Sequence, residues 1–309
     1  MRGAVAHELS GIDSVEVGEL PDPVPAAGQA LVRVSAAGVG PWDVGFLGGG
    51  FPGIALPFVP GQEVAGVVEA IGDAADVRPG DRVYGSLFPA GGGFAELALA
   101  SADHLAPMPD QVSFPGAAGL VIGAGTAYQG LVDRGLLQAG ETVLITAAAG
   151  GVGSAAVQIA AALGARPLGV ASPRNHDYLR GLGAGAVFDY HAPDWVQQVR
   201  VVVPAGVDVL FDCVGGQTKD QAVGAVRDSG RVISVIPPFG HFELERGVTS
   251  DSFAASGGRE LLEALSRLVD AGQLLPQVEA VLPLGQVREA LRRVAGGHTR
   301  GKVVVQIGP

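Results

Sequence analysis

The hydrophobic positions along this chain follow one pattern before about Ser113 and another after it. In the first part, short stretches alternate between apolar and polar residues, which is typical of strands with one buried face. Turns rich in glycine and proline separate these stretches. The alternating stretches are residues 14–17, 30–34, 64–71 and 94–99, and the turns are residues 21–23, 48–50 and 79–81. This pattern predicts an antiparallel, barrel-like β domain.

After Ser113, short apolar runs alternate with helical patterns. This order predicts an α/β fold with a doubly wound parallel sheet. The predicted strands are residues 142–146, 167–171, 186–188, 207–211 and 231–235. The predicted helices are residues 152–163, a segment from Asn175, a segment near Trp195 and residues 218–226. Two amphipathic helices, residues 260–271 and 285–294, and a final strand, residues 302–307, are expected in the remainder.

The first of these strands leads into a glycine turn with the spacing of a nucleotide-binding motif. Residues 142–165 carry no charged side chain, and residues 147–153 read Ala-Ala-Ala-Gly-Gly-Val-Gly. Glycine lets a phosphate approach the backbone because it has no Cβ, and the following helix offers free N–H groups and a positive dipole end. A membrane span and a strand–turn–helix unit without a ligand are the alternatives. We expect a dinucleotide pyrophosphate to bind at Gly150, Gly151, Val152 and Gly153.

The composition limits the functions that are open to the chain. Its 309 residues suffice for two domains, and 48% hydrophobic residues supply a large core. The net charge of −11 argues against nucleic acid and anionic membranes as partners. Cys213 is the single cysteine, so no intramolecular disulfide can form. Because no apolar stretch near residue 1 is long enough for a signal peptide, a cytoplasmic location is expected.

A series of short motifs points to a family. They are Pro-Gly-Gln-Glu-Val-Ala-Gly at 60–66, Gly-Asp-Arg-Val at 80–83, Gly-Thr-Ala-Tyr at 125–128, the glycine turn, Leu-Gly-Ala at 182–184, Asp-Tyr at 189–190, Asp-Cys-Val-Gly-Gly at 212–216 and Gly-Lys-Val-Val at 301–304. In this order the chain resembles, from end to end, the medium-chain dehydrogenase/reductase superfamily and its zinc-free quinone oxidoreductase branch. The resemblance implies a GroES-like catalytic domain at residues 1–112, completed by residues 256–309. It also implies a Rossmann dinucleotide-binding domain at residues 113–255 and an active site in the cleft.

The positions at which zinc-dependent members of this superfamily carry metal ligands hold other residues here. The resemblance places the ligand cysteine at Gly40 and the ligand histidine at Gln62. Zinc prefers thiolate, imidazole or carboxylate, so neither residue is a usual ligand. The six histidines are scattered without ligand spacing, and one cysteine cannot form the four-cysteine structural lobe. We therefore expect no metal site.

The end of the second predicted Rossmann strand favours NADPH over NADH. A carboxylate there would bind the ribose 2′-hydroxyl of NAD, but residues 171–175 read Ala-Ser-Pro-Arg-Asn. Ser172, Arg174 and Asn175 can instead donate hydrogen bonds to a 2′-phosphate. The resemblance adds the phenol of Tyr190 to this phosphate site. The alternative is that Arg174 is an ordinary surface residue at the start of a helix.

The expected reaction is hydride transfer to a small-molecule quinone or to the β-carbon of an enone. Both acceptors develop negative charge on an oxygen, which needs hydrogen-bond donors when no metal is present. Trp42 and Gln62 are the candidate donors, and aromatic packing and a structural hydrogen bond are the competing explanations for them. Asp43 is interpreted as a loop cap rather than as an active-site group.

The resemblance also assigns residues to the cofactor and to the substrate pocket. Thr126 would contact the nicotinamide. The backbone that would flank the same ring is that of Cys213, Val214, Ile236 and Pro237. The pocket wall would include Trp42, Phe51, Phe94 and Phe239. Related enzymes often carry a tyrosine where Phe51 falls, and phenylalanine cannot donate a proton.

Two other functions and an oligomeric state are considered. An enoyl-thioester reductase of the fatty-acid or polyketide type fits the loop at residues 51–53, although an acidic chain offers no basic patch for a carrier protein. A cofactor-binding protein with little catalysis, similar to lens crystallins, is the other alternative. The resemblance implies a homodimer, in which the apolar segment at residues 231–239 would form a sheet edge that pairs with a second copy.

Overall fold

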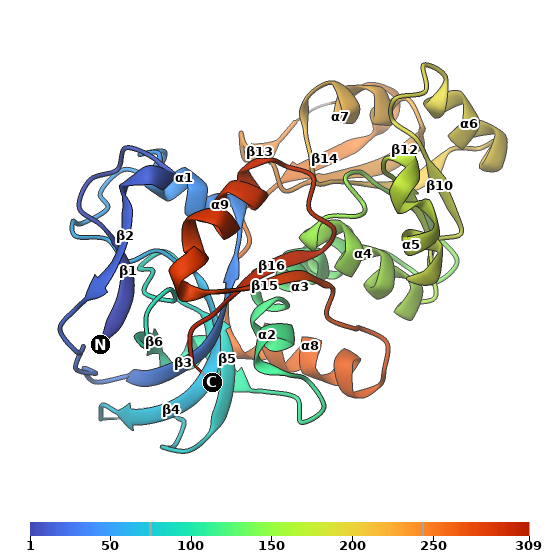
Figure 1. Ribbon diagram of the computed structural model, residues 1–309. Helices are drawn as coiled ribbons and strands as arrows, with labels where there is room; N and C mark the ends of the chain where they lie inside the picture. Colours follow the sequence, from blue (N-terminus) through green and yellow to red (C-terminus); the bar gives the residue numbers. More distant parts are fainter. Residues whose placement is uncertain (74–75, 243, 309) are drawn as a thin grey trace. The chain divides into compact units, whose positions relative to one another are not determined.

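The computed structural model describes residues 1–73, 76–242 and 244–308, which form two compact units (Figure 1). Unit 1 comprises Met1–Ile122, Gly257–Asp270 and Pro276–Pro309, and unit 2 comprises Gly123–Ser256 and Ala271–Leu275. Residues 113–122 lie in unit 1 rather than in the dinucleotide-binding part, because helix α2 (Phe114–Ala118) packs on the sheet of unit 1. Residues 271–275 lie in unit 2, where the backbone of Leu275 forms two hydrogen bonds with the side chain of Gln158.

Unit 1 is built on a seven-stranded sheet with the strand order β15-β16-β3-β4-β5-β7, and β6 also pairs with β3. Its strands are β3 (Gln29–Val39), β4 (Glu63–Ile71), β5 (Arg82–Ser86), β6 (Leu97–Ser101), β7 (Leu105–Pro107), β15 (Val278–Pro283) and β16 (Lys302–Gln306). The long strand β3 pairs with β4 on one edge and with β6 and then β16 on the other. The strands before Ser113 pair antiparallel, as predicted, and β15 and β16, for which no pairing is predicted, run parallel.

The remaining elements of unit 1 cover this sheet. Strands β1 (Arg2–Ala6) and β2 (Val15–Glu19) form a separate antiparallel pair. The other helices of the unit are α1 (Pro41–Leu47), α8 (Arg259–Asp270) and α9 (Val287–Ala295), with 3₁₀ turns at Ile12–Ser14, Ala102–His104 and Leu284–Gln286. The two predicted amphipathic helices correspond to α8 and α9, whose buried residues recur on one face.

Unit 2 contains the doubly wound sheet, with the strand order β10-β9-β8-β11-β12-β14-β13. Its strands are β8 (Thr142–Ile145), β9 (Arg166–Val170), β10 (Ala186–Phe188), β11 (Val207–Asp212), β12 (Val226–Ser234), β13 (Gly240–His241) and β14 (Thr249–Ser252). Counted along the chain, the six parallel strands have the order 3-2-1-4-5-6 of dinucleotide-binding folds. The crevice for a ligand in such a sheet lies at the carboxyl ends of strands 1 and 4, which are β8 and β11 here.

Helices alternate with the strands of unit 2 from β8 to β12, as the pattern predicts, and one further helix precedes β8. They are α3 (Val121–Tyr128), which begins in unit 1 and continues as a π-helix (Gln129–Arg134), α4 (Gly151–Ala162), α5 (His176–Gly181), α6 (Trp195–Val202) and α7 (Gly216–Val223), with 3₁₀ turns at Pro173–Asn175 and Glu245–Gly247. Helix α4 packs on β8 and β9, and α7 packs on β11 and β12. In the part of the chain that the structure describes, no helix has the length and apolarity needed to span a membrane.

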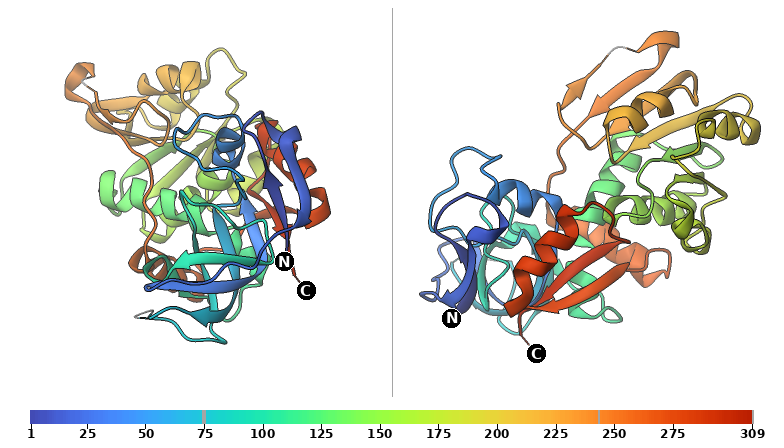
Figure 2. Two further views of the ribbon diagram at one scale, coloured as in Figure 1. Left: turned by 90° about the vertical axis from the view of Figure 1, so that its left-hand side faces the viewer. Right: turned by 45° about the horizontal axis from the view of Figure 1, so that its top comes forward.

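One sequence prediction about this sheet is wrong. The strand predicted at residues 231–235 is the second half of β12, which pairs with β11 on one side and with β14 on the other. Residues 231–239 therefore do not form a sheet edge. The outermost strands are β10 at one end and β13 at the other, and β13 is drawn in orange in Figure 2.

Candidate functional site

The glycine turn joins β8 to α4 and combines a close-packed glycine with an open one. A Cβ on Gly153 would lie 2.4 Å from the carbonyl oxygen of Ala147, so this glycine lets the helix approach the turn. A Cβ on Gly150 would have only that same oxygen within 4 Å, at 3.4 Å, so the backbone here is open to a ligand. Gly150 is the N-cap residue of the 12-residue helix α4. The turn therefore fits a pyrophosphate held by helix N–H groups.

The residues predicted to recognise a 2′-phosphate follow two neighbouring parallel strands. Ser172 and Arg174 come directly after β9, and Tyr190 comes two residues after β10. The two strands pair in register up to Val170 and Phe188, so both segments leave the same edge of the sheet. The Arg174 side chain is exposed, and Asn175 is buried with its amide donating to the Ser172 hydroxyl at 3.3 Å. Asp177, the nearest carboxylate in sequence after β9, lies within α5 and pairs with Arg180.

The residues predicted to flank the nicotinamide lie at the carboxyl ends of β11 and β12. Cys213 and Val214 directly follow β11, and Ile236 and Pro237 follow β12. Thr126 is buried within α3, one turn before the π-helix. Burial raises the pKa of the Cys213 thiol well above its usual range, so this cysteine is a neutral thiol at pH 7 rather than a nucleophile. Sequence reasoning did not assign a role to Asp212, a fully buried carboxylate at the same edge.

The position of the catalytic zinc in related enzymes does not fit a metal here. A Cβ on Gly40 would lie 2.1 Å from Cε2 of Trp42, so the indole ring fills the space that a ligand side chain would need. Gln62 is fully buried and supplies a neutral amide. In the described residues, no group of three or more His, Cys, Asp or Glu side chains could hold a metal ion.

Buried polar side chains without a hydrogen-bond partner lie in this part of unit 1. Within the described residues, the indole Nε1 of Trp42 and both amide atoms of Gln62 are buried without a hydrogen-bond partner. The ammonium of Lys302 lies 4.8 Å from the centroid of the Trp42 ring and 2.5 Å from Oε1 of Glu63. Buried polar atoms normally have partners, so the atoms without one indicate a place for a bound water or a ligand atom.

Asp43 is a cap, as predicted. One carboxylate oxygen accepts the N–H of Gly40, the N-cap residue of α1, at 2.9 Å, and the other accepts the N–H of Gly61 at 3.0 Å. The carboxylate thus ties the start of α1 to the segment before β4. Its removal from water raises the pKa of Asp43 to about 7.

The aromatic residues predicted to line a pocket have different environments. The Phe51 ring stacks on Phe46, with a centroid distance of 4.1 Å, and meets the half-exposed Phe88 edge-on at 6.4 Å. Phe94 is fully buried in the core of unit 1, where its backbone carbonyl accepts the N–H of Ala4, and its place in a pocket wall stays a prediction. Phe239, in unit 2, is 51% exposed. Phe51, together with Trp42, remains a candidate for a substrate wall in unit 1.

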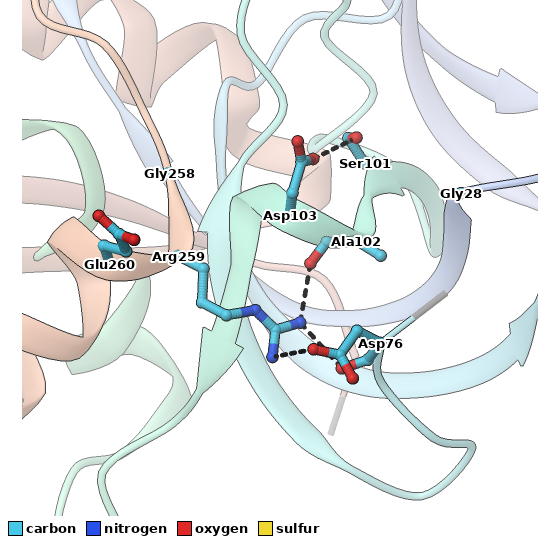
Figure 3. A pocket seen from close by; sticks show the side chains of 8 residues that line it. All are labelled: Gly28, Asp76, Ser101, Ala102, Asp103, Gly258, Arg259 and Glu260. Atoms are coloured by element: carbon cyan, nitrogen blue, oxygen red, sulfur yellow. Dashed lines mark hydrogen bonds and ion pairs between the residues drawn. The ribbon is translucent and has the colours of Figure 1, made fainter. Parts of the chain in front are cut away.

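A separate pocket of about 630 Å³ lies on unit 1 (Figure 3). Its lining residues are Gly28, Asp76, Ser101, Ala102, Asp103, Gly258, Arg259 and Glu260. The guanidinium of Arg259 donates to the carbonyl oxygens of Asp76 and Ala102 and lies 3.6 Å from the Asp76 carboxylate. Among the residues described around this pocket, none is a predicted site residue. The pocket is therefore distinct from the candidate site.

Comparison with known families agrees with this architecture. Residues 26–110 match the alcohol dehydrogenase GroES-like domain, and residues 182–305 match the zinc-binding dehydrogenase family. The name of the second family refers to zinc. The positions that the resemblance assigns to the zinc ligands are occupied by Gly40 and Gln62 in this chain. The family matches therefore define the architecture, while the ligand residues of the zinc-dependent members are absent at these two positions.

Individual relatives identify the superfamily. Human quinone oxidoreductase is 30% identical, and the match covers 99% of this chain and 97% of the relative. The structure of the quinone oxidoreductase from Coxiella burnetii is similar with a TM-score of 0.89 at 28% identity, covering 99% of both chains. The CurK enoyl reductase is similar with a TM-score of 0.87 at 27% identity, also covering 99% of both.

The chain belongs to the medium-chain dehydrogenase/reductase superfamily and is similar to its quinone oxidoreductases. Membership implies an oxidoreductase that uses a nicotinamide cofactor, NADH or NADPH, and acts on a small molecule. The glycine turn and the strand order of unit 2 provide the independent structural support for such a cofactor.

Proposed function

We propose that this protein transfers a hydride from NADPH to a quinone or to an α,β-unsaturated carbonyl without a metal. The observation that carries the proposal is a set of buried polar atoms near Gly40 and Gln62, the two positions that correspond, by resemblance, to zinc ligands of related enzymes. Trp42 fills the space beside Gly40, and its Nε1 and the amide of Gln62 lack partners among the described residues. When bound, the cofactor supplies a hydride from C4 of its nicotinamide ring.

The two N–H donors have the chemistry that such an acceptor requires. A carbonyl oxygen gains negative charge as the hydride arrives, and preorganised donors in a dry site stabilise that charge. The indole Nε1 of Trp42 donates only, and the Gln62 amide offers two N–H groups. Phe51 cannot supply a proton, but the oxygens of a hydroquinone take protons from water. This favours a quinone over an enone, whose carbon must be protonated.

Replacing Gln62 tests the proposal. Gln62→Leu removes the amide at similar volume, so we expect kcat with a simple quinone to fall about 10²-fold, as for loss of one oxyanion donor. The free energy of unfolding should not fall, because no hydrogen bond is broken and buried unsatisfied atoms are removed. NADPH oxidation and urea unfolding measure the two effects. A stability loss with an unchanged kcat would make Gln62 a structural residue only.

Gln158→Leu is the matched control for this test. Gln158 is also a buried glutamine, but its amide bonds to the backbone of Leu275 in unit 2. This variant should lose stability, and the quinone should be reduced at an unchanged rate per folded molecule.

The wild type should also be assayed with a crotonyl thioester. Faster turnover of the thioester than of any quinone would favour an enoyl-thioester reductase, an alternative that the similarity to the CurK enoyl reductase supports. Binding of NADPH without turnover of either would indicate a cofactor-binding protein.

The choice of NADPH rests on the residues that follow β9. We propose that Arg174, with Ser172, Asn175 and Tyr190, binds the 2′-phosphate. Arg174→Ala should weaken NADPH binding by about 1.5–3 kcal/mol, the range for a hydrogen bond to a charged group, and should leave NADH binding nearly unchanged. Fluorescence titration of both cofactors measures this, with Arg180→Ala as the control for charge. Equal losses for NADPH and NADH would rule out a phosphate contact by Arg174.

A further inference from the structure

We propose that Asp212 is a positioning residue that fixes the loops following β11 and β12, on which the nicotinamide end of the cofactor rests. This inference depends on the proposed function, since it assumes that the cofactor lies at this edge of the unit 2 sheet. Asp212 is the last residue of β11 and is fully buried. It stands at the carboxyl end of strand 4 of the doubly wound order, beside strand 1, where such sheets bind their ligands.

The carboxylate of Asp212 binds three chain segments at once. Oδ1 accepts the hydroxyl of Thr146 at 2.8 Å and the backbone N–H of Gly215 at 3.0 Å, with that of Val214 at 3.3 Å. Oδ2 accepts the hydroxyl of Ser234 at 2.7 Å. Thr146 directly follows β8, and Ser234 ends β12. The carboxylate therefore joins the ends of β8, β11 and β12.

The two hydroxyls extend this network to the loop backbone. Each hydroxyl donates its single proton to Asp212, so its lone pairs can accept hydrogen bonds from other donors. Thr146 Oγ1 accepts the N–H of Cys213 at 2.9 Å, and Ser234 Oγ accepts the N–H of Ile236 at 3.2 Å. Four loop N–H groups are thus bound directly to Asp212 or through one hydroxyl. The two carboxylate oxygens of Asp212 therefore lie at the centre of this network.

The loops also contact each other. Gly215 has a φ of 71°, and a Cβ there would lie 2.9 Å from Cγ2 of Ile236. On the far side, the Ser252 hydroxyl donates to the carbonyl of Ile236 at 2.7 Å. Glycine at position 215 therefore allows the close approach of Ile236, and a shift of either loop would break these hydrogen bonds. The backbone near the proposed nicotinamide is therefore held in one conformation before any ligand binds, which lowers the ordering cost of binding.

A carboxylate at the opposite end of the same strand separates positioning from stability. Asp208 lies near the start of β11 and accepts the N–H of Thr142 at 2.8 Å and Nε of Arg227 at 2.7 Å. It likewise joins β11 to β8, but at the amino edge, away from the loops. Asp208→Asn is therefore the matched control for Asp212→Asn. Asparagine places an N–H₂ group where one carboxylate oxygen accepted hydrogen bonds, so either change breaks part of a network.

The experiment measures cofactor binding and loop protection in full-length protein. Asp212→Asn should raise the NADPH dissociation constant about tenfold or more, the equivalent of one lost hydrogen bond to a charged group. In the protein without cofactor, it should speed amide hydrogen exchange at Val214 and Gly215. Thr146→Val should have the same effects to a smaller extent. Thr146→Ser keeps the hydroxyl, so its dissociation constant and its amide exchange should match those of the wild type. Asp208→Asn should leave the dissociation constant and the exchange of these two amides within about twofold of wild type.

The outcomes distinguish this inference from the proposed function. If Asp212→Asn and Asp208→Asn lower Tm alike and neither changes cofactor binding or loop exchange, Asp212 is only a structural residue. If Asp212→Asn does not fold, Thr146→Val and Thr146→Ser decide: equal dissociation constants for this pair and the wild type would overturn the inference. If the wild type itself binds neither NADPH nor NADH, the proposed function fails first and the inference falls with it.

Discussion

At the scale of single residues, the packing of Trp42 depends on glycine at position 40. Glycine at position 40 leaves room for the indole ring, which would otherwise lie 2.1 Å from a Cβ. The resemblance places a ligand cysteine of zinc-dependent relatives at this position. The structure adds that Gly40→Cys alone would not build a metal site, because the ring already fills the space and Gln62 remains an amide.

The buried carboxyl of Asp43 predicts a pH-dependent stability. Burial raises its pKa to about 7 from 3.8, and the charge of Glu63 adds to this rise. The N–H groups of Gly40 and Gly61 lower the pKa in part. Because the folded chain holds the proton more tightly than the unfolded chain, this group stabilises the fold fully below pH 3.8 and loses that contribution as pH rises through 7. From pH 5 to pH 8, the free energy of unfolding should fall by roughly 2–3 kcal/mol from this group.

Asp43→Asn isolates this contribution, because asparagine does not titrate. Urea unfolding of both proteins at pH 5 and pH 8 gives two differences, and the fall should be smaller in the variant by the amount expected for Asp43. The absolute stability of the variant does not enter the comparison. An identical fall in both proteins would show that the carboxyl of Asp43 keeps an ordinary pKa in the folded chain.

Sequence reasoning found the residues of the candidate site that follow a motif and missed those that depend on packing. The glycine turn and the cap Asp43 have local signatures, so their positions could be predicted. The resemblance assigns Phe94 to the pocket wall, and its burial in the core of unit 1 depends on packing that the sequence does not show. Asp212 received no role because its partners, Thr146 and Ser234, are brought to it only by the strand order of the sheet.

At the scale of elements, the two glycines of the β8–α4 turn should respond differently to alanine. Gly150→Ala places a methyl group in open space at an ordinary φ of −76°, so the change in stability should stay within about 0.5 kcal/mol. The same methyl group would occupy the face offered to the pyrophosphate, so NADPH binding should weaken at least about tenfold. Thermal unfolding and fluorescence titration measure the two effects.

Gly153→Ala is the counterpart. It should lower stability directly, and it should weaken cofactor binding only as a consequence. A Cβ there meets backbone atoms of Ala147 and Ala148 at 2.4–2.6 Å, which cannot rotate away. The helix must shift from the turn, so stability should fall by about 1–3 kcal/mol, typical of overpacking, and cofactor binding should fall as a consequence. If Gly150→Ala destabilises the protein as much as Gly153→Ala does, the turn is a packing unit rather than a phosphate site.

Elements with strong periodicity were predictable, and short polar strands were not. Strand β10 has the predicted bounds, and helices α4 and α8 differ from theirs by one residue at each end. Strand β14 (Thr249–Ser252) has no apolar run, and its strand conformation comes from pairing with β12. The first half of β12 reads Val-Arg-Asp-Ser, which has no strand signal either, and in it only Val226 pairs with β11, before a shift in register. Pairing with β12, rather than local propensity, determines β14.

At the scale of the whole molecule, the chain order of strands and helices was enough to predict the fold class. Alternating strands and helices allow few right-handed arrangements, so a doubly wound sheet could be predicted without its exact strand order. The borders between the two units could not be predicted from the sequence. Residues 113–122 lie in unit 1 because Glu63 accepts the N–H of Ile122, a contact between residues far apart in sequence.

We predict that the protein is a homodimer and that the pairing involves β13, the edge strand of unit 2. An edge strand leaves backbone N–H and C=O groups unpaired on its outer side, which favours pairing with a second copy. The residues around it include Phe239 and Phe242, which are 51% and 43% exposed. Light scattering at micromolar concentration should give twice the 31.1 kDa of one chain.

Phe242→Asp should shift the mass toward one chain, because a charge in an apolar interface is strongly unfavourable. Phe88→Asp is the matched control, since Phe88 is 40% exposed but lies in unit 1, and it should leave the dimer intact. A wild-type mass of one chain would show that the protein is a monomer. A dimer that Phe242→Asp leaves unaffected would show that the pairing surface lies away from β13.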